Sequence, residues 1–107
     1  MADKEIRVIH FPANGQPKLL TIKDELGEYQ RLVGGRIETY RMKKTGLLVL
    51  MDKDGWKKQL QPHCLFGFFL GDLVLVGNSG EEYASVTDED VRRFERNYEV
   101  RVQVEVH

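Results

Sequence analysis

The apolar run Leu47–Met51 is the feature that most restricts the fold, because five apolar residues follow one another with no polar residue between them. A strand with one face in water alternates apolar and polar residues, whereas a strand covered on both faces reads as a continuous apolar run. We therefore expect a central strand over residues 47–51, with structure packed on each side of it. A chain of 107 residues is long enough to bury such a strand in a single domain, residues 1–107, without disulfides.

A double glycine marks the end of the first expected helix. Apolar residues recur with helical spacing over residues 24–33, and Asp24 stands where an N-terminal cap is expected. Gly34 and Gly35 follow directly, and glycine readily adopts the left-handed conformation that ends many helices. The pattern predicts a helix, a stop at Gly34 and then a strand over residues 36–42.

The other regular segments read as one further helix and several strands. Thr87 and Asp90 are spaced as a capping box and predict a helix over residues 87–96. Alternating or apolar runs predict further strands at residues 5–11 and 19–22, a bent or bulged strand pair within residues 65–76, and a C-terminal strand at residues 98–106. The turn over residues 52–55 predicts a strand that runs back at residues 56–60. Together these elements predict an α+β fold, with a mainly antiparallel sheet of about five to seven strands packed against two short helices.

The C-terminal segment, residues 98–106, alternates five apolar residues with charged or polar ones. This alternation predicts a strand with one buried face. At a sheet edge such a strand exposes unpaired backbone groups, which a second copy can cover in a two-fold homodimer. In the alternative, the strand completes the sheet of a monomer at an edge protected by its charged residues. Both oligomeric states are open at this point.

Charge is balanced over the chain but uneven along it. Lys and Arg total 16 and Asp and Glu total 17, which excludes a strongly cationic nucleic-acid module, so nucleic acid is not the favoured partner. Residues 41–58, however, hold six basic residues and two acidic ones. Trp56, Lys57 and Lys58 lie together in this segment and could bind an anionic ligand through charge and ring stacking. The alternative is a basic surface that is simply solvated.

His63 and Cys64 are the strongest candidates for catalysis, because they place a base next to the only thiol. Neighbouring residues on a strand point to opposite faces, so they would not readily form a catalytic pair. We therefore expect no catalytic residue, no bound metal and no cofactor. No apolar stretch is long enough to span a membrane, no signal peptide is evident, and a single cysteine suits a reducing compartment. The expected location is the cytoplasm, without membrane binding.

Several motifs together carry a resemblance to a known family. They are Gln30-x-x-Val33-Gly34-Gly35-x-Ile37-Glu38, Leu60-x-Pro62, Gly71-Asp72-x-Val74 and Val86-Thr87-Asp88-Glu89-Asp90. Over residues 5–96 the chain resembles a phage and mobile-element family of small proteins catalogued as a domain of unknown function. After the Leu-x-Pro motif the family pattern has Asn, where this chain has His63. The resemblance implies a phage or mobile-element origin and action in the cytoplasm of a bacterial host.

These observations favour a non-catalytic binding protein that inhibits or sequesters a host component. The partner would be a host protein or a small anionic ligand such as a nucleotide signal. The candidate ligand-binding residues are Trp56, Lys57, Lys58, His63, Gln30 and Glu38. The alternative is a small enzyme that acts on nucleotides or proteins through His63 or Cys64.

Overall fold

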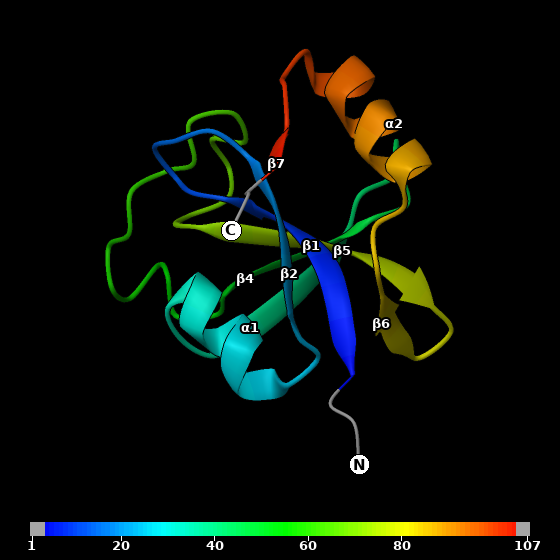
Figure 1. Cartoon of the computed structure of the whole chain (residues 1–107). Coiled ribbons are helices and arrows are strands. Elements are labelled where there is room, and N and C mark those ends of the chain that lie inside the picture. Colours follow the sequence, from blue (N-terminus) through cyan, green and yellow to red (C-terminus); the bar gives the residue numbers. More distant parts are fainter. Residues whose placement is uncertain (1–3, 105–107) are drawn as a thin grey trace.

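The computed structural model describes residues 4–104 and contains, within that range, seven strands and two helices (Figure 1). In chain order they are β1 (Glu5–Phe11), β2 (Lys18–Lys23), α1 (Leu26–Val33), β3 (Ile37–Arg41), β4 (Leu48–Asp52), β5 (Leu73–Ser79), β6 (Glu82–Ala84), α2 (Asp88–Tyr98) and β7 (Gln103–Val104).

The strands form one sheet. Six of them lie in the order β3-β4-β5-β1-β2-β7, and β6 pairs with β5 beside this path. The described pairs are antiparallel, except that β7 runs parallel to β2. This confirms the α+β fold with a mainly antiparallel sheet and two helices.

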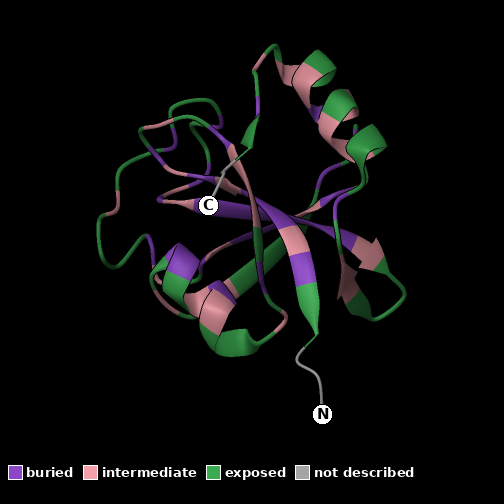
Figure 2. Ribbon diagram, viewed as in Figure 1, coloured by how far each residue is buried: buried purple, intermediate pink, exposed green. Residues whose placement is uncertain are grey.

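The sheet separates two apolar cores, because successive residues of a strand point to opposite faces. In β1, Ile9 and Phe11 belong to one core, and Val8 belongs to the other. α2 contributes Phe94 to the first core, and α1 contributes Tyr29 to the second. The two helices therefore cover opposite faces of the sheet, and Figure 2 shows the buried residues running along its middle strands.

β4 confirms the predicted central strand. It lies between β3 and β5 and pairs with both. Val49 and Leu50 are completely buried, Val49 in the core beneath α2 and Leu50 in the core beneath α1. The unbroken apolar run thus corresponds to burial on both faces.

The C-terminal end of α1 agrees with the prediction, but its N-terminal end does not. The helix begins at Leu26 with Glu25 as its N-terminal cap residue, and no side chain caps it. The prediction of Asp24 as the cap is wrong, because its carboxylate accepts a hydrogen bond from the Tyr29 hydroxyl instead. The stop at Gly34 is confirmed, since this residue takes a φ of 92°, in the left-handed region.

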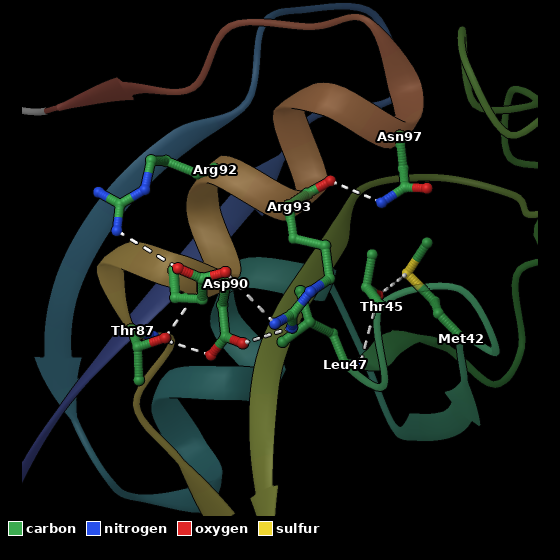
Figure 3. Close-up of polar contacts among 9 residues, drawn as sticks. Met42, Thr45, Leu47, Thr87, Asp90, Arg92, Arg93 and Asn97 are labelled. Atoms are coloured by element: carbon green, nitrogen blue, oxygen red, sulfur yellow. Dashed lines mark hydrogen bonds and ion pairs between the residues drawn. The ribbon is translucent and has the colours of Figure 1, made fainter.

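The capping box of α2 is confirmed. The Asp90 N–H donates to Thr87 Oγ1 at 3.0 Å, and the Thr87 N–H donates to the Asp90 carboxylate at 2.9 Å (Figure 3). The helix runs to Tyr98, slightly beyond its predicted end at residue 96. Within residues 4–104, neither helix is long and apolar enough to cross a membrane.

The prediction of a strand over residues 56–60 is wrong. After β4 the chain makes turns over residues 53–59, and Gln59 takes a φ of 55°, which a strand does not allow. The buried Asp52 carboxylate accepts hydrogen bonds from the Asp54 N–H at 2.8 Å and from Lys58 Nζ at 2.7 Å. These bonds hold the turns against the end of β4, whose sheet partners are β3 and β5.

The predicted strand pair within residues 65–76 is wrong in its first half. Only the residues from Leu73 onward form a strand, β5. The preceding residues form a loop, within which Pro62 and Leu70 make one isolated antiparallel bridge. Gly71, with a φ of 82°, turns the chain from this loop into β5.

The predicted C-terminal strand over residues 98–106 is confirmed only at Gln103–Val104, which form β7, and is wrong over residues 98–102. Tyr98 belongs to α2, where its ring packs 5.2 Å from that of Phe94 one turn earlier, and β7 has only two residues. Val102 is buried but Val104 is exposed, and residues 105–107 lie outside the described range. The homodimer through this segment stays a prediction that light scattering can test.

Candidate binding surface

Three aromatic side chains are exposed, although large rings normally contribute to cores. Trp56 is 83% exposed, Phe68 76% and Tyr40 48%. They come from three different segments: Tyr40 from β3, Trp56 from the turns after β4, and Phe68 from the loop before β5.

Two cavities connect these rings. The first has a volume of about 230 Å³ and lies between Tyr40 and Phe68. Its lining is completed by Met42, Lys43, Lys44, Phe66, Phe69 and Tyr98. The second has a volume of about 150 Å³ and is lined by Phe68 and Trp56 together with Glu38 and Lys53, among others. Because Phe68 borders both cavities, the three rings belong to one surface.

We call this region the aromatic–lysine surface. It consists of the three rings and four nearby lysines: Tyr40, Trp56, Phe68, Lys43, Lys44, Lys53 and Lys57. Lys57 is assigned to it as the exposed neighbour of Trp56 in sequence, and the other three lysines line the cavities.

The loop that carries Phe68 is closed by hydrogen bonds to His63. The N–H groups of Leu65 and Phe66 donate to His63 Nδ1 at 3.1 Å and 3.2 Å. The His63 N–H donates to the Phe69 carbonyl at 2.9 Å, and the Phe69 N–H donates to the Phe66 carbonyl at 2.8 Å. These bonds fix the backbone on both sides of Phe68, so its exposed ring is presented by an ordered loop.

His63 itself lies under this loop and is only 2% exposed. Its ring makes an edge contact with that of Phe11, with 4.2 Å between the centroids. Burial lowers the pKa of the His63 imidazole, because the charged form loses its hydration. Nδ1 can accept the two backbone bonds only when it is unprotonated, so the neutral ring carries its proton on Nε2, which is buried and has no hydrogen-bond partner among the described residues.

The hairpin turn between β3 and β4 holds Lys43 and Lys44 beside the first cavity. The Met42 N–H donates to the Leu47 carbonyl, and the Gly46 N–H donates to the Met42 carbonyl, both at 2.8 Å. Figure 3 shows the further bond from the Leu47 N–H to the Thr45 hydroxyl, at 3.3 Å. Lys44 Nζ lies 6.0 Å from the centre of the Tyr98 ring, within reach of a cation–π contact.

Asp52 at the end of β4 and Asp54 in the turns that follow are paired with basic residues outside the aromatic–lysine surface. Arg36 donates two hydrogen bonds to the Asp54 carboxylate, at 2.9 Å and 2.7 Å, and this pairing lowers the pKa of Asp54. Asp52 is paired with Lys58. Glu38 and the paired Asp52 line the second cavity, whereas the lining of the first cavity contains two lysines and no acidic residue.

The candidate residues from the sequence fall into different environments. Trp56 and Glu38 line the second cavity together, and Lys57 is exposed beside Trp56. Lys58 is held by the Asp52 carboxylate and by the Gly34 carbonyl, which accepts from its Nζ at 3.0 Å. Whether these residues bind a ligand stays a prediction.

The other two candidates, His63 and Gln30, do not line either cavity. His63 is buried beneath the loop, and Gln30 is half-buried on α1, which packs on the opposite face of the sheet from α2. Sequence reasoning missed Phe68. The available signal was that residues 66–69 contain three phenylalanines and a glycine, since a short loop has little room to bury three rings.

His63 and Cys64 differ in exposure, as His63 is buried and Cys64 is exposed. The Cys64 thiol lies 3.8 Å from the Gly15 carbonyl, to which it donates a weak hydrogen bond. Among residues 4–104, no group of three His, Cys, Asp or Glu side chains is arranged to hold a metal ion.

Comparison with known proteins gives one family match. The model of a family described as a domain of unknown function (DUF3846) matches residues 6–99, which is most of the chain. Comparison with curated proteins gave no match, and neither did comparison with solved structures.

Proposed function

The chain belongs to the family described as a domain of unknown function (DUF3846), and we propose that it is a non-catalytic binding protein that inhibits or sequesters a host component through the aromatic–lysine surface. The observation that supports this is the exposure of three rings, Tyr40, Trp56 and Phe68, on one surface. Exposed apolar surface of this kind marks interaction sites, because covering it with a partner removes apolar area from water.

The composition of the surface is typical of a binding site. Aromatic residues, methionine and arginine are enriched at the centres of protein interfaces, and charged residues lie at the rim. Here the rings line two cavities, and Lys43 and Lys53 are charged residues of the same linings. A host protein and a small anionic ligand are both compatible with this arrangement.

A phage or mobile-element origin is part of the proposal. Its support is the motif resemblance of residues 30–38 noted from the sequence. On this proposal the partner is a component of the bacterial host cytoplasm.

A small enzyme that uses His63 or Cys64 has less support. His63 Nδ1 already accepts two backbone hydrogen bonds, and the side chain is buried. It therefore offers no accessible base to activate the exposed Cys64 thiol or a substrate.

The proposal is tested by capture from a bacterial host lysate on the immobilised full chain. We expect a stoichiometric partner that is retained by the wild type and lost by the double variant Trp56→Ala/Phe68→Ala. Leu26→Ala is the matched control, because Leu26 is 63% exposed but lies on α1. A partner retained equally by all three proteins, or none retained by any, contradicts the proposal.

Catalysis is tested separately by incubating the protein with a panel of nucleotides and measuring product. We expect no turnover. Turnover that is abolished by His63→Asn or Cys64→Ser contradicts the non-catalytic assignment.

A further inference from the structure

We propose that the aromatic–lysine surface binds a short segment of a partner protein that carries one large apolar side chain between acidic residues. This inference rests on the proposed function and adds the chemistry of the partner. The apolar side chain occupies the first cavity, between Tyr40 and Phe68, and the neighbouring carboxylates lie against Lys43 and Lys44.

The lining of the first cavity selects an apolar occupant. Six of its side chains are aromatic or are methionine, and the charged groups belong to two lysines: Tyr40, Met42, Phe66, Phe68, Phe69, Tyr98, Lys43 and Lys44. A nucleobase would bring several donors and acceptors into this cavity, where lysines offer no acceptor and the rings offer only two hydroxyls. Buried polar groups without partners are costly, whereas an apolar side chain needs none.

The cavity is also suited to a single large apolar anchor, either aliphatic or aromatic. Its volume of about 230 Å³ is large enough to hold one large side chain. Met42, which lines the cavity, has a flexible side chain that can adapt to occupants of different shape. The aromatic rings of the lining already contact one another. The ring centroids of Tyr40 and Phe69 lie 5.5 Å apart in an edge contact, and those of Phe68 and Phe69 lie 4.4 Å apart in a tilted contact.

The charge of the surface selects acidic neighbours for that anchor. Within residues 4–104, none of Lys43, Lys44, Lys53 and Lys57 takes part in an ion pair, whereas Lys58 and Arg36 are paired with acids. The chain as a whole has a formal net charge of −1, so this excess of positive charge is local. Complementary charge across an interface determines specificity and speeds association, so the four lysines favour a segment rich in Asp and Glu.

The walls of the cavity are held in place before any partner binds. The hairpin turn at residues 42–47 is closed by backbone hydrogen bonds at both ends, and the loop at residues 63–69 is tied to His63. Tyr98 stands at the end of α2, whose start is fixed by a capping box. A site that is ordered in advance loses less freedom on binding, which is what allows a short segment to bind measurably.

The test is selection of a random dodecapeptide display library on the immobilised full chain, with counter-selection on Phe68→Ala. We expect the enriched peptides to share one Leu, Ile, Met, Phe or Trp with Asp or Glu within about three positions of it. Enriched peptides without an apolar anchor, or with basic residues around it, overturn the inference.

One enriched peptide is then synthesised and its affinity is measured by fluorescence anisotropy. We expect Phe68→Ala to weaken binding about tenfold or more, since truncation of a central aromatic anchor has effects of this size. Lys43→Glu/Lys44→Glu should weaken binding to a similar extent and reduce its dependence on salt. Trp56 is the only tryptophan and is 83% exposed, so a shift of its emission independently reports occupation nearby.

Two matched controls separate the surface from general effects. Leu26→Ala removes an exposed apolar side chain elsewhere, and Lys18→Glu/Arg101→Glu, at two basic residues outside the surface, makes the same change in net charge as the Lys43 and Lys44 reversal. Both control proteins should bind the peptide as the wild type does. Equal loss of binding in a control and in its matched surface variant overturns the inference.

The outcomes also separate this inference from the proposed function. If the lysate partner is lost with Trp56→Ala/Phe68→Ala but no peptide is selected, binding through the surface stands and the acidic segment is wrong. Preferential binding of a single-stranded oligonucleotide, or self-association that masks Phe68, would likewise overturn the inference alone. If capture from lysate does not depend on the surface, the proposed function itself is wrong.

Discussion

Replacement of the buried His63 tests how the exposed surface is built. In His63→Ala, the N–H groups of Leu65 and Phe66 lose their shared acceptor, and the ring contacts of His63 with Phe11 and Phe66 are removed. We expect this variant to be strongly destabilised and its loop to lose order around Phe68. His63→Asn is the informative partner, because an Asn side-chain oxygen can accept from N–H groups two and three residues later.

The magnitude follows from the contacts. The buried Phe66 N–H costs about 1–3 kcal/mol when it is left without an acceptor, and the partly buried Leu65 N–H costs less. The lost ring contacts add about 0.5–1.5 kcal/mol. We therefore expect His63→Ala to lower the free energy of unfolding by about 3 kcal/mol or more, and His63→Asn to lower it by about half as much. In a domain of this size, about 3 kcal/mol corresponds to a fall in Tm of roughly 12–24 °C.

The pH dependence gives a second, independent readout. Burial holds the pKa of His63 in the folded protein below its ordinary value of about 6.5, which applies to the unfolded chain. Below pH 6.5 the unfolded chain therefore binds more protons at this site than the folded protein does. The contribution of His63 is fully present above pH 6.5 and is lost as the pH falls toward its lower folded-state pKa. The His63→Asn variant does not lose stability in this way, because Asn does not take up a proton in this pH range.

The assay is urea denaturation followed by circular dichroism at pH 7.5 and pH 5.5. The free energy of unfolding of the wild type should fall more between these pH values than that of His63→Asn. Cys64→Ala, at the exposed neighbour, serves as the control and should change stability by less than about 0.5 kcal/mol. A His63→Ala protein within 1 kcal/mol of the wild type, or equal stability of the Ala and Asn variants, would refute the reasoning.

Three further predictions concern the helices and can be checked by thermal unfolding. Gly34→Val should lower Tm by several degrees, because a side chain at a φ of 92° costs about 1 kcal/mol or more although the space around it is open; an unchanged Tm would contradict this. Gly27→Ala should raise stability by about 0.5–1 kcal/mol, since this helical glycine has no neighbour within 4 Å of an added Cβ; a lower Tm would speak against it. Thr87→Ala should cost about 1 kcal/mol through loss of the cap, and a change of less than 0.3 kcal/mol would show that the capping box contributes little.

Local physical chemistry accounts for the parts of the fold that were predicted correctly. A left-handed helix end needs glycine, a capping box needs a hydroxyl and a carboxylate three residues apart, and a strand covered on both faces needs an unbroken apolar run. Gly34, Thr87 with Asp90, and Leu47–Met51 meet these requirements within a few neighbouring residues. Such features can be recognised without knowing what the rest of the chain does.

The wrong predictions arose where side-chain contacts outweighed a local pattern. The turn over residues 52–55 favours a strand that runs back at residues 56–60, but the bond of Lys58 to the buried Asp52 carboxylate holds them in turns. The C-terminal alternation includes Tyr98, yet this ring packs against Phe66 and Phe94 as the last residue of α2. Period-two patterns describe which residues can share a face, but partners elsewhere in the chain determine whether a strand forms.

In the candidate site, too, some residues could be proposed from local sequence features and others depended on the whole fold. Trp56 and its lysines could be proposed from the sequence, because an aromatic residue after a turn and a cluster of basic residues are local features. Phe68 and His63 lie where their side-chain polarity alone would not place them, because the apolar ring is exposed and the polar ring is buried. The reason is that His63 Nδ1 satisfies two backbone N–H groups inside the loop, while Phe66 and Phe69 occupy the core and leave Phe68 outside it. Hydrogen-bond satisfaction and core volume depend on the whole fold, and no pattern within the segment specifies them.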